Sequence, residues 1–195
     1  MRTKLSQGNY IPFTQPYNTA PYNCRGTESV PENTMLSDIV DWVLVEFRQG
    51  TAIVTQKAGI LKANRKAIDT TTNSGIVFNN LPTGSYQVVI RHRNHLAIGT
   101  NTPIILTLGQ VAILDLTTNA NVKGFNQAVL KAGVYGMRRA NINGNNAISA
   151  SDRAVSRQAA DSNNIYRQAD VNMDGMINSQ DRTMSRLSTE AIETI

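Results

Sequence analysis

The chain has 195 residues, enough for one large domain or two small ones, and 41% of them are hydrophobic. Because no apolar run approaches about eighteen residues, we expect no membrane span. The net charge of +5 comes from scattered Lys and Arg without an aromatic-rich basic stripe, so we expect no nucleic-acid partner. The N-terminus shows no charged region followed by an apolar core, as expected of a secreted chain after its signal peptide is removed.

The charge is unevenly distributed along the chain. Residues 1–140 hold 14 Lys/Arg against 7 Asp/Glu, whereas residues 141–195 hold 5 against 7. This change of composition predicts a boundary near residue 140. We therefore divide the chain into an extended N-terminal segment (1–37), a β-sandwich domain (38–135), a duplicated loop module (136–188) and a C-terminal tail (189–195).

The first 37 residues are rich in Asn, Pro, Thr, Tyr and Gly and lack periodicity. This composition predicts extended, turn-punctuated chain lying over a surface, with its tyrosines and prolines packed. The segment contains the only cysteine, Cys24, which is either a lone structural thiol or half of a disulfide between chains.

Short stretches of β-branched and aromatic residues follow at regular spacing. The best are "IVDWVLVEF" (39–47) and a stretch in which Tyr86, Val88 and Ile90 alternate with polar neighbours. The predicted strands cover 39–47, 51–56, a strand that ends at Phe78, 86–91, 103–108 and 111–117. Many short strands separated by turn signals favour a mainly β fold of the β-sandwich type.

The C-terminal part of the chain is an internal duplication with an offset of 29 residues. Residues 141–157 ("NINGNNAISASDRAVSR") align with residues 170–186 ("DVNMDGMINSQDRTMSR"). The identical pairs are Asn143/Asn172, Ile148/Ile177, Asp152/Asp181, Arg153/Arg182, Ser156/Ser185 and Arg157/Arg186. Each loop is followed by a segment of helical pattern, expected to begin at Asp152 and at Asp181.

The second loop has the oxygen ligands of a calcium site. Calcium takes six to eight oxygens, and a twelve-residue loop supplies them from positions 1, 3, 5, 7, 9 and 12. These positions are Asp170, Asn172, Asp174, the Met176 carbonyl, Asn178 (directly or through water) and Asp181. Gly175 stands at position 6, where the chain turns sharply. Ile177 at position 8 is placed to pair with Ile148 of the other loop.

The first loop has the same layout with fewer charges. Its ligand positions are Asn141, Asn143, Asn145, the Ala147 carbonyl, Ser149 and Asp152, of which only Asp152 is anionic. Asn146 replaces the glycine, and asparagine tolerates the left-handed conformation that the turn requires. The loop is therefore either a weak calcium site or a calcium-free loop held by its own amide hydrogen bonds.

Residues 136–188 resemble the dockerin module, which has two EF-hand-like calcium loops, each followed by a helix. The aspartate that closes each loop, instead of glutamate, carries the resemblance. Dockerins bind cohesin domains through their helices. The resemblance therefore implies a protein-binding face that includes Arg153, Arg157, Arg182 and Arg186.

The upstream stretches "DIVDWVLVEFR" and "NNLPTGSYQVVIRHRNHLAIGT" resemble a region that precedes such repeats in large secreted proteins of Bacteroidota-type bacteria. The pattern F-x-N-L-P-x-G-x-Y-x-V also resembles transthyretin-like sandwich modules. This resemblance implies a further strand ahead of residue 1, and hence an open sheet edge.

Two other groups of polar residues lack the partners that a zinc site or a pair of catalytic carboxylates requires. His92 and His95 lack further zinc ligands, so we expect a strand-end pair in surface hydrogen bonds. Asp41 and Glu46 lie five residues apart on one strand and are expected to face opposite sides, so they do not form a glycosidase pair. Without G-x-S-x-G, P-loop or H-E-x-x-H motifs, we expect no enzymatic activity.

These observations favour a non-catalytic, calcium-stabilised structural protein at a bacterial cell surface or outside the cell. It would assemble with copies of itself or another surface protein, in a filament or surface layer, by strand addition or surface contacts. The alternative is a dockerin-like module that anchors the β-sandwich to a cohesin-type scaffold. Carbohydrate binding would need an exposed aromatic platform, whereas the only tryptophan, Trp42, is expected in the core.

Overall fold

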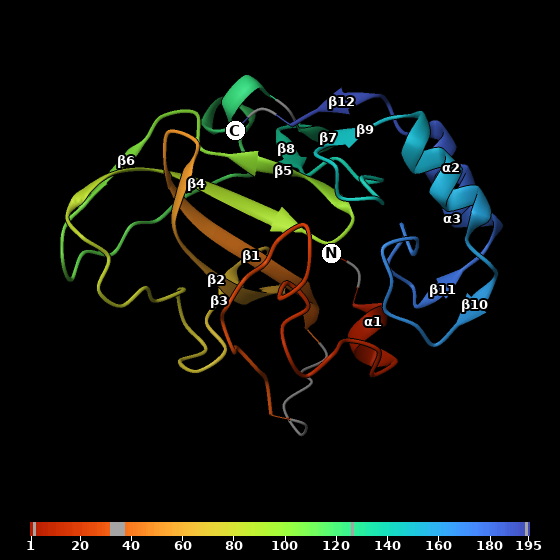
Figure 1. Cartoon of the computed structure of the whole chain (residues 1–195), viewed down its shortest axis with the longest axis horizontal. Helices are drawn as coiled ribbons and strands as arrows, with labels where there is room; N and C mark the ends of the chain where they lie inside the picture. The colour runs from red at the N-terminus through yellow and green to blue at the C-terminus, as the bar shows by residue number, and fades with distance from the viewer. Residues whose placement is uncertain (2, 32–37, 126, 194) are drawn as a thin grey trace.

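The computed structural model describes residues 1, 3–31, 38–125, 127–193 and 195, and its fold is mainly β with antiparallel sheets (Figure 1). The largest sheet has six strands, β1 (Ile39–Gln49), β2 (Ala52–Lys62), β3 (Ala67–Ile68), β4 (Gly84–His92), β5 (His95–Gly99) and β6 (Ile104–Leu106). Its order is β3-β2-β1-β4-β5, and β6 also pairs with β4.

The central hairpin confirms the two strands predicted first. β1 and β2 pair antiparallel from Gln49↔Ala52 outwards, and both are longer than predicted. The turn between them contains Gly50 with φ 60°, a left-handed conformation that glycine adopts without steric cost. The predicted strand at 86–91 is also confirmed, within β4.

Two predicted strands are wrong. The stretch that ends at Phe78 is an irregular loop, and residues 111–117 form no strand. β6 occupies only three residues of the predicted strand at 103–108. Apolar β-branched runs favour strands only where a neighbouring strand and a packing face exist. Residues 111–115 are exposed and have no neighbouring strand in the described chain, and β8 (Val134–Gly136) reaches only Thr117, through the Tyr135 amide at 2.9 Å.

The two faces of the central sheet carry separate cores, because successive side chains of a strand point to opposite faces. Trp42 and Leu44 belong to one core, and Val45 and Phe47 of the same strand belong to the other. In the second core, Phe47 meets the ring of Phe78 edge-on, with 4.6 Å between ring centroids. Phe78 and Leu81 reach this core from the irregular loop before β4.

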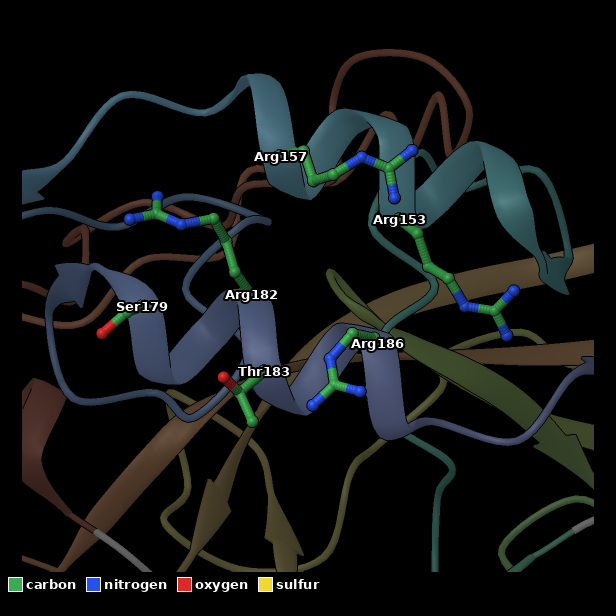
Figure 2. Close-up of a pocket in the computed structure, with 6 residues that line it drawn as sticks. All are labelled: Arg153, Arg157, Ser179, Arg182, Thr183 and Arg186. Atoms are coloured by element: carbon green, nitrogen blue, oxygen red, sulfur yellow. The ribbon is translucent and has the colours of Figure 1, made fainter.

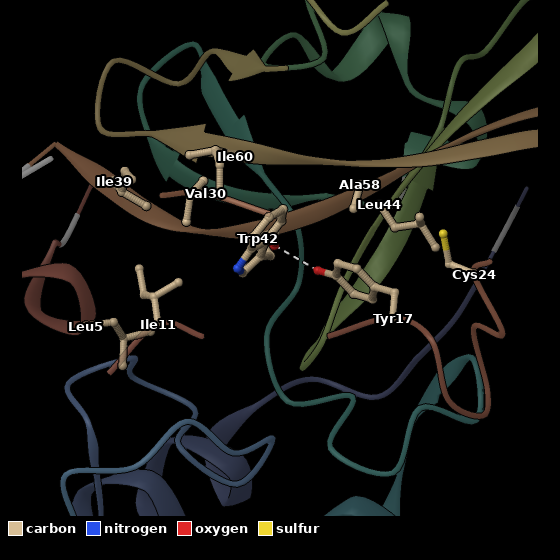
Figure 3. Packing of buried hydrophobic residues seen from close by; sticks show 10 residues of the cluster. All are labelled: Leu5, Ile11, Tyr17, Cys24, Val30, Ile39, Trp42, Leu44, Ala58 and Ile60. Atoms are coloured by element: carbon tan, nitrogen blue, oxygen red, sulfur yellow. Dashed lines mark hydrogen bonds between the residues drawn. The ribbon is translucent and has the colours of Figure 1, made fainter. Parts of the chain in front are cut away.

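The N-terminal segment covers the Trp42 face. It contains helix α1 (Lys4–Gln7) and supplies Leu5, Ile11, Tyr17 and Cys24 to the core (Figure 3). The Tyr17 hydroxyl donates a 2.7 Å hydrogen bond to the Trp42 carbonyl, and the Trp42 indole donates one of 2.9 Å to Pro12. The predicted packing of this segment and the core position of Trp42 are therefore confirmed. Cys24 is a free, buried thiol.

A long connection with little regular structure joins the sheet to the C-terminal part. It contains two 3-10 turns, η2 (Asn119–Asn121) and η3 (Lys123–Phe125), and a hairpin of β7 (Ala128–Lys131) and β8 (Val134–Gly136). The chain then runs beside the β5 edge, where the Leu96 amide donates to the Arg138 carbonyl at 2.7 Å and Ala140 donates to Asn94 at 2.9 Å. This contact ties the duplicated region to the sheet.

The duplicated region folds with two-fold internal symmetry. Its elements are β9 (Ala147–Ile148), α2 (Ala150–Gln158), β10 (Ser162–Asn163), β11 (Met176–Ile177), α3 (Ser179–Leu187) and β12 (Ala191–Ile192). Each helix begins two residues before the predicted aspartate. Figure 1 shows the helix pair at one end of the molecule, far from β6.

Each repeat lends a strand to the other. The segment after α2 forms β10 and pairs with β11 of the second loop, whereas the segment after α3 forms β12 and pairs with β9 of the first loop. The predicted pairing of Ile148 with Ile177 is therefore wrong, because Ile148 pairs with Ala191 and Ile177 pairs with Ser162. Residues 191–192 of the expected C-terminal tail thus complete the symmetric unit.

Candidate metal centre

The two loops share one hydrogen-bonded frame, built on the aspartate that closes each loop. Asp181 Oδ1 accepts from the amides of Val171 (2.9 Å) and Asn172 (3.1 Å), and its Oδ2 accepts from Asn178 (3.0 Å). Asp152 repeats this pattern with the amides of Ile142, Asn143 and Ser149. Both carboxylates are fully buried at the third position of their helices and complete a capping box there.

The backbones of the loops also correspond. The fourth and sixth positions are left-handed in both, with Gly144 and Asn146 in the first loop and Met173 and Gly175 in the second. Asn146 adopts φ 65°, which confirms that asparagine replaces the glycine without loss of the turn. Only the side chains therefore distinguish the two loops.

The first position is the main difference. Asp170 is fully buried, and its two oxygens accept from the amides of Asp174 (3.1 Å) and Gly175 (3.0 Å). Burial raises the pKa of Asp170 to about 6, and the nearby Asp181 acts in the same direction, while Arg93 and the two amides oppose this rise. The carboxylate therefore lacks sufficient counter-charge, which a bound cation would supply.

Asn172 is the clearest sign of a ligand. Its side chain is 6% exposed, yet neither its Oδ1 nor its Nδ2 has a hydrogen-bond partner. A buried amide without partners costs free energy, and a cation bound at Oδ1 would recover part of it. Asp174 stands beside it with one oxygen accepting only from Met176 (3.0 Å).

The other predicted ligands of the second loop already have hydrogen-bond partners or offer only a backbone carbonyl. Asn178 caps α3, because its Oδ1 accepts from the Gln180 amide at 2.7 Å, so it would reach an ion through water. Met176 contributes its carbonyl from β11, and its side chain is exposed. Asp181 has about one acceptor position left beyond its three amide partners. The donor set of hard oxygens fits calcium.

The first loop satisfies most of its own side-chain oxygens. Asn143 Oδ1 accepts from the Asn145 amide at 3.1 Å, and Asn145 Oδ1 accepts from the Ala147 amide at 3.2 Å. Ser149 caps α2 through the Ser151 amide. Only the Asn141 Oδ1 is buried and unpaired among its predicted ligands. The geometry corresponds to the calcium-free alternative, in which amide hydrogen bonds close the loop.

Within the described residues, no three His, Cys, Asp or Glu side chains are grouped closely enough to hold a metal ion by themselves. The second loop would thus depend on amide and carbonyl oxygens in addition to its carboxylates. No described His, Cys, Asp or Glu joins His92 and His95 in such a group.

A buried ion pair links the second loop to the sheet. Arg93 donates from Nε to Asp41 Oδ2 at 3.0 Å and from Nη1 to the Arg167 carbonyl. Its Nη2 has no hydrogen-bond partner and lies 4.0 Å from Asp170 Oδ2. Arg93 therefore places a positive charge from the end of β4 beside Asp170, the first position of the second loop.

The surroundings of Asp41 hold this arrangement in place. Burial opposes ionisation, but the charges of Arg93 and His92 outweigh it, and they hold the pKa of Asp41 well below its usual range. Tyr166 donates to Asp41 at 2.5 Å and lies under the Arg93 guanidinium, 4.3 Å from the ring centroid. Glu46 belongs to a separate cluster with Arg91, at 2.8 Å.

The expected surface position of the histidine pair is wrong. His92 is buried and contacts Asp41 Oδ2 through Nε2 at 3.1 Å, and its Nδ1 lies 3.0 Å from His95 Nδ1. Burial, together with His92 and Arg93, holds the pKa of His95 well below its usual range. Sequence reasoning missed the link to Asp41. A carboxylate inside an apolar strand was the available signal, because such a group requires a buried partner.

The N-terminal segment touches both loops. A Cβ at Gly175 would overlap the Tyr10 ring, and a Cβ at Gly144 would lie 3.0 Å from Pro21 Cγ. The Tyr10 hydroxyl also donates to Asn164 at 2.7 Å. The segment therefore packs on the sheet and the loops together.

The four predicted protein-binding arginines fall into two classes. Arg153 donates to Glu190 at 2.8 Å and to the Ser188 carbonyl, and Arg182 donates to Asp161 at 2.6 Å and to the Ala159 carbonyl. These contacts tie each helix to the segment that follows the other helix. Arg157 and Arg186 are exposed and have no ion pair in the part of the chain that the structure describes.

No described helix has the length and apolarity needed to cross a membrane. No protein-family model matches the chain, and neither the curated proteins nor the solved structures contain a significant match.

Proposed function

We propose that this protein is a non-catalytic, extracellular structural subunit of a bacterial surface, stabilised by calcium at the second loop. In this proposal, copies of the chain assemble by adding strands at the β6 edge. The fold proposal that accompanies it is a transthyretin-like sandwich followed by a dockerin-like calcium module. The observation that carries the assembly proposal is a largely exposed apolar segment that begins with β6.

This segment, Ile104–Leu114, has the composition of a buried strand, but most of it is exposed and only Leu106 is buried. Ile105 is 71% exposed, Leu108 and Val111 are 84% exposed, and Ile113 is 93% exposed. Contiguous apolar side chains at a surface are typical of interaction sites. The segment contains no charged residue, so it lacks the charges that commonly protect a sheet edge from pairing.

A second copy of this segment is the proposed occupant. β6 pairs only with β4 among the described strands, which leaves its outer hydrogen-bonding groups available. Two apolar, β-branched segments can pair with each other and bury their side chains in the contact, because strand addition depends on backbone hydrogen bonds and alternating side chains. Assembly would then give residues 111–117 the neighbouring strand that they lack in a single chain.

Sedimentation and electron microscopy of the full chain, with calcium and with chelator, test this proposal. We expect larger species that grow with concentration, and we expect Val111→Lys with Ile113→Lys to abolish them. The matched control is Leu187→Lys with Ile192→Lys, which adds the same charge at exposed apolar sites elsewhere. A chain that remains monomeric at high concentration in calcium would contradict self-assembly.

Calcium supports assembly indirectly in this proposal. An ion that binds only the folded loop stabilises the module by mass action. Calcium should therefore raise the melting temperature of the full chain, while magnesium, which demands a smaller octahedral site, should raise it less. Equal melting temperatures in calcium and chelator would remove calcium from the proposal.

A further inference from the structure

The groove between α2 and α3 concentrates positive charge, and only two of its four arginines have a carboxylate partner in the described chain. It has a volume of about 240 Å³ and is lined by Arg153, Arg157, Ser179, Arg182, Thr183 and Arg186. Figure 2 shows Arg153 and Arg182 directed to opposite sides of the helix pair, with Arg157 and Arg186 extending from the facing helices. All six lining side chains offer hydrogen-bond donors, and none is a carboxylate.

The outer arginines show what this surface already binds. Arg153 holds a carboxylate and a backbone carbonyl two residues apart, Glu190 and Ser188, on an extended stretch of chain. Arg182 holds the equivalent pair, Asp161 and Ala159. The same recognition therefore occurs twice within the molecule, each time with an acidic residue that is mostly exposed.

The inner arginines have the same chemistry without an occupant. Arg157 and Arg186 lie one helical turn beyond Arg153 and Arg182, so they project from nearly the same helix faces. Both are exposed, and the described chain supplies no ion pair to either. Like charges at this spacing repel each other, and an external anion would relieve that repulsion.

We propose that this groove binds an extended acidic segment of a partner protein, through Arg157 and Arg186. A guanidinium recognises carboxylates in a bidentate geometry, and arginine clusters commonly recognise acidic motifs. The internal contacts favour a polypeptide over a sulfated polysaccharide, because each outer arginine uses a backbone carbonyl as well as the carboxylate. In both internal pairs the carboxylate lies two residues after the carbonyl, so we expect the bound segment to be extended at its acidic residue.

This inference is independent of assembly through β6, because the groove and β6 lie at opposite ends of the molecule (Figure 1). Loss of acidic-peptide binding would therefore leave sedimentation unchanged. Loss of assembly would leave the peptide bound. The two proposals can fail separately.

The test measures binding of a short fluorescent peptide of alternating glutamate and serine to the full chain in calcium, by anisotropy. We expect binding that weakens with salt and falls at least about fivefold in Arg157→Gln with Arg186→Gln, because two exposed ion pairs are removed. The matched control, Arg25→Gln with Arg65→Gln, removes the same charge from exposed arginines that do not line the groove.

Three results would overturn the inference. The first is absence of peptide binding, and the second is an equal loss in both double variants, which would reduce the effect to net charge. The third is that dextran sulfate binds more tightly than the peptide and that its binding depends on the same arginines, which would assign the groove to polysaccharides. Circular dichroism of each variant checks that the fold is retained.

Discussion

The two loops of the duplicated region have the same pattern of left-handed backbone positions and the same closing aspartate, yet they differ in buried charge and in which side-chain oxygens remain unpaired. In the second loop, Asp170 takes the amides of Asp174 and Gly175, and the Asn172 oxygen remains unpaired. In the first loop, where Asn141 replaces the aspartate, the Asn143 oxygen is used by the Asn145 amide. One charged side chain at the first position therefore decides whether the third position is available to a cation.

The comparison separates the side chains that organise a loop from the side chains that add charge to it. Asp152 and Asp181 organise the turn and the helix in both loops, with three amides each. Asp170 and Asp174 add the negative charge that a divalent ion requires, and they occur only in the second loop. Structure and metal binding can thus be altered separately by mutation.

The largest expected effect is on stability, and it should be the same in both loops. Asp152→Ala and Asp181→Ala each leave three amides without their acceptor, so each should lower the free energy of unfolding in chelator by about 3–5 kcal/mol. Only Asp181→Ala should also change calcium binding. Chemical denaturation and calcium titration of both variants measure this. An Asp181→Ala variant with unchanged melting and unchanged calcium titration would contradict the assignment.

The next effect should be confined to metal binding. Asp170→Asn makes the first position of the second loop identical to that of the first loop, so calcium affinity should fall about a hundredfold or more, as a charged ligand is lost. The reciprocal change, Asn141→Asp, should give the first loop measurable calcium affinity. Calorimetric titration distinguishes these results. Unchanged affinity in Asp170→Asn would show that the second loop does not bind through its first position.

Arg93 provides a test of the link between the second loop and the sheet. Arg93→Gln removes a positive charge near Asp170, so calcium affinity should rise about tenfold. It also leaves Asp41 buried without its main partner, so stability in chelator should fall. Asp41→Asn is the control, since it weakens the same ion pair but keeps the guanidinium beside the loop. If calcium affinity falls in Arg93→Gln, then the guanidinium instead positions the ligand carboxylate.

The smallest effect concerns pH and should distinguish the loops as well. In chelator, burial raises the pKa of Asp170 to about 6. The stability that the protonated Asp170 contributes is therefore fully present below the ordinary pKa of an aspartate, and it is lost as the pH rises through about 6. Calcium requires the ionised carboxylate, so affinity at pH 5.5 should be about fourfold lower than at pH 7.5. Asn141 does not titrate, and a first loop converted by Asn145→Asp should lack this dependence. A pH-independent affinity between these values would contradict the raised pKa.

The local sequence pattern was sufficient to predict several features of the fold. The alternation in 39–47 and 86–91 predicted strands that form the centre of the sheet, because their apolar side chains have partners on both faces. The repeat offset predicted two equivalent loops and their helices, whose capping side chains lie within the repeat itself. The composition of residues 1–37 predicted packed, irregular chain, and Tyr17 and Ile11 are buried accordingly.

Other features depended on contacts between residues distant in the sequence. The apolar run at 111–117 has the composition of a strand, but a strand needs a neighbour along its length, and in the described chain β8 reaches only Thr117. The exchange of β10 and β12 between repeats depends on where each helix directs the following segment, which the ligand spacing does not specify. The chain by itself thus determined the strands of the central sheet, the duplication and the charge of each loop, because these follow from nearby residues. Only the tertiary structure placed Arg93 between Asp41 and Asp170 and left residues 107–113 exposed, because burial depends on the whole fold. It also left Arg157 and Arg186 without an ion pair among the described residues.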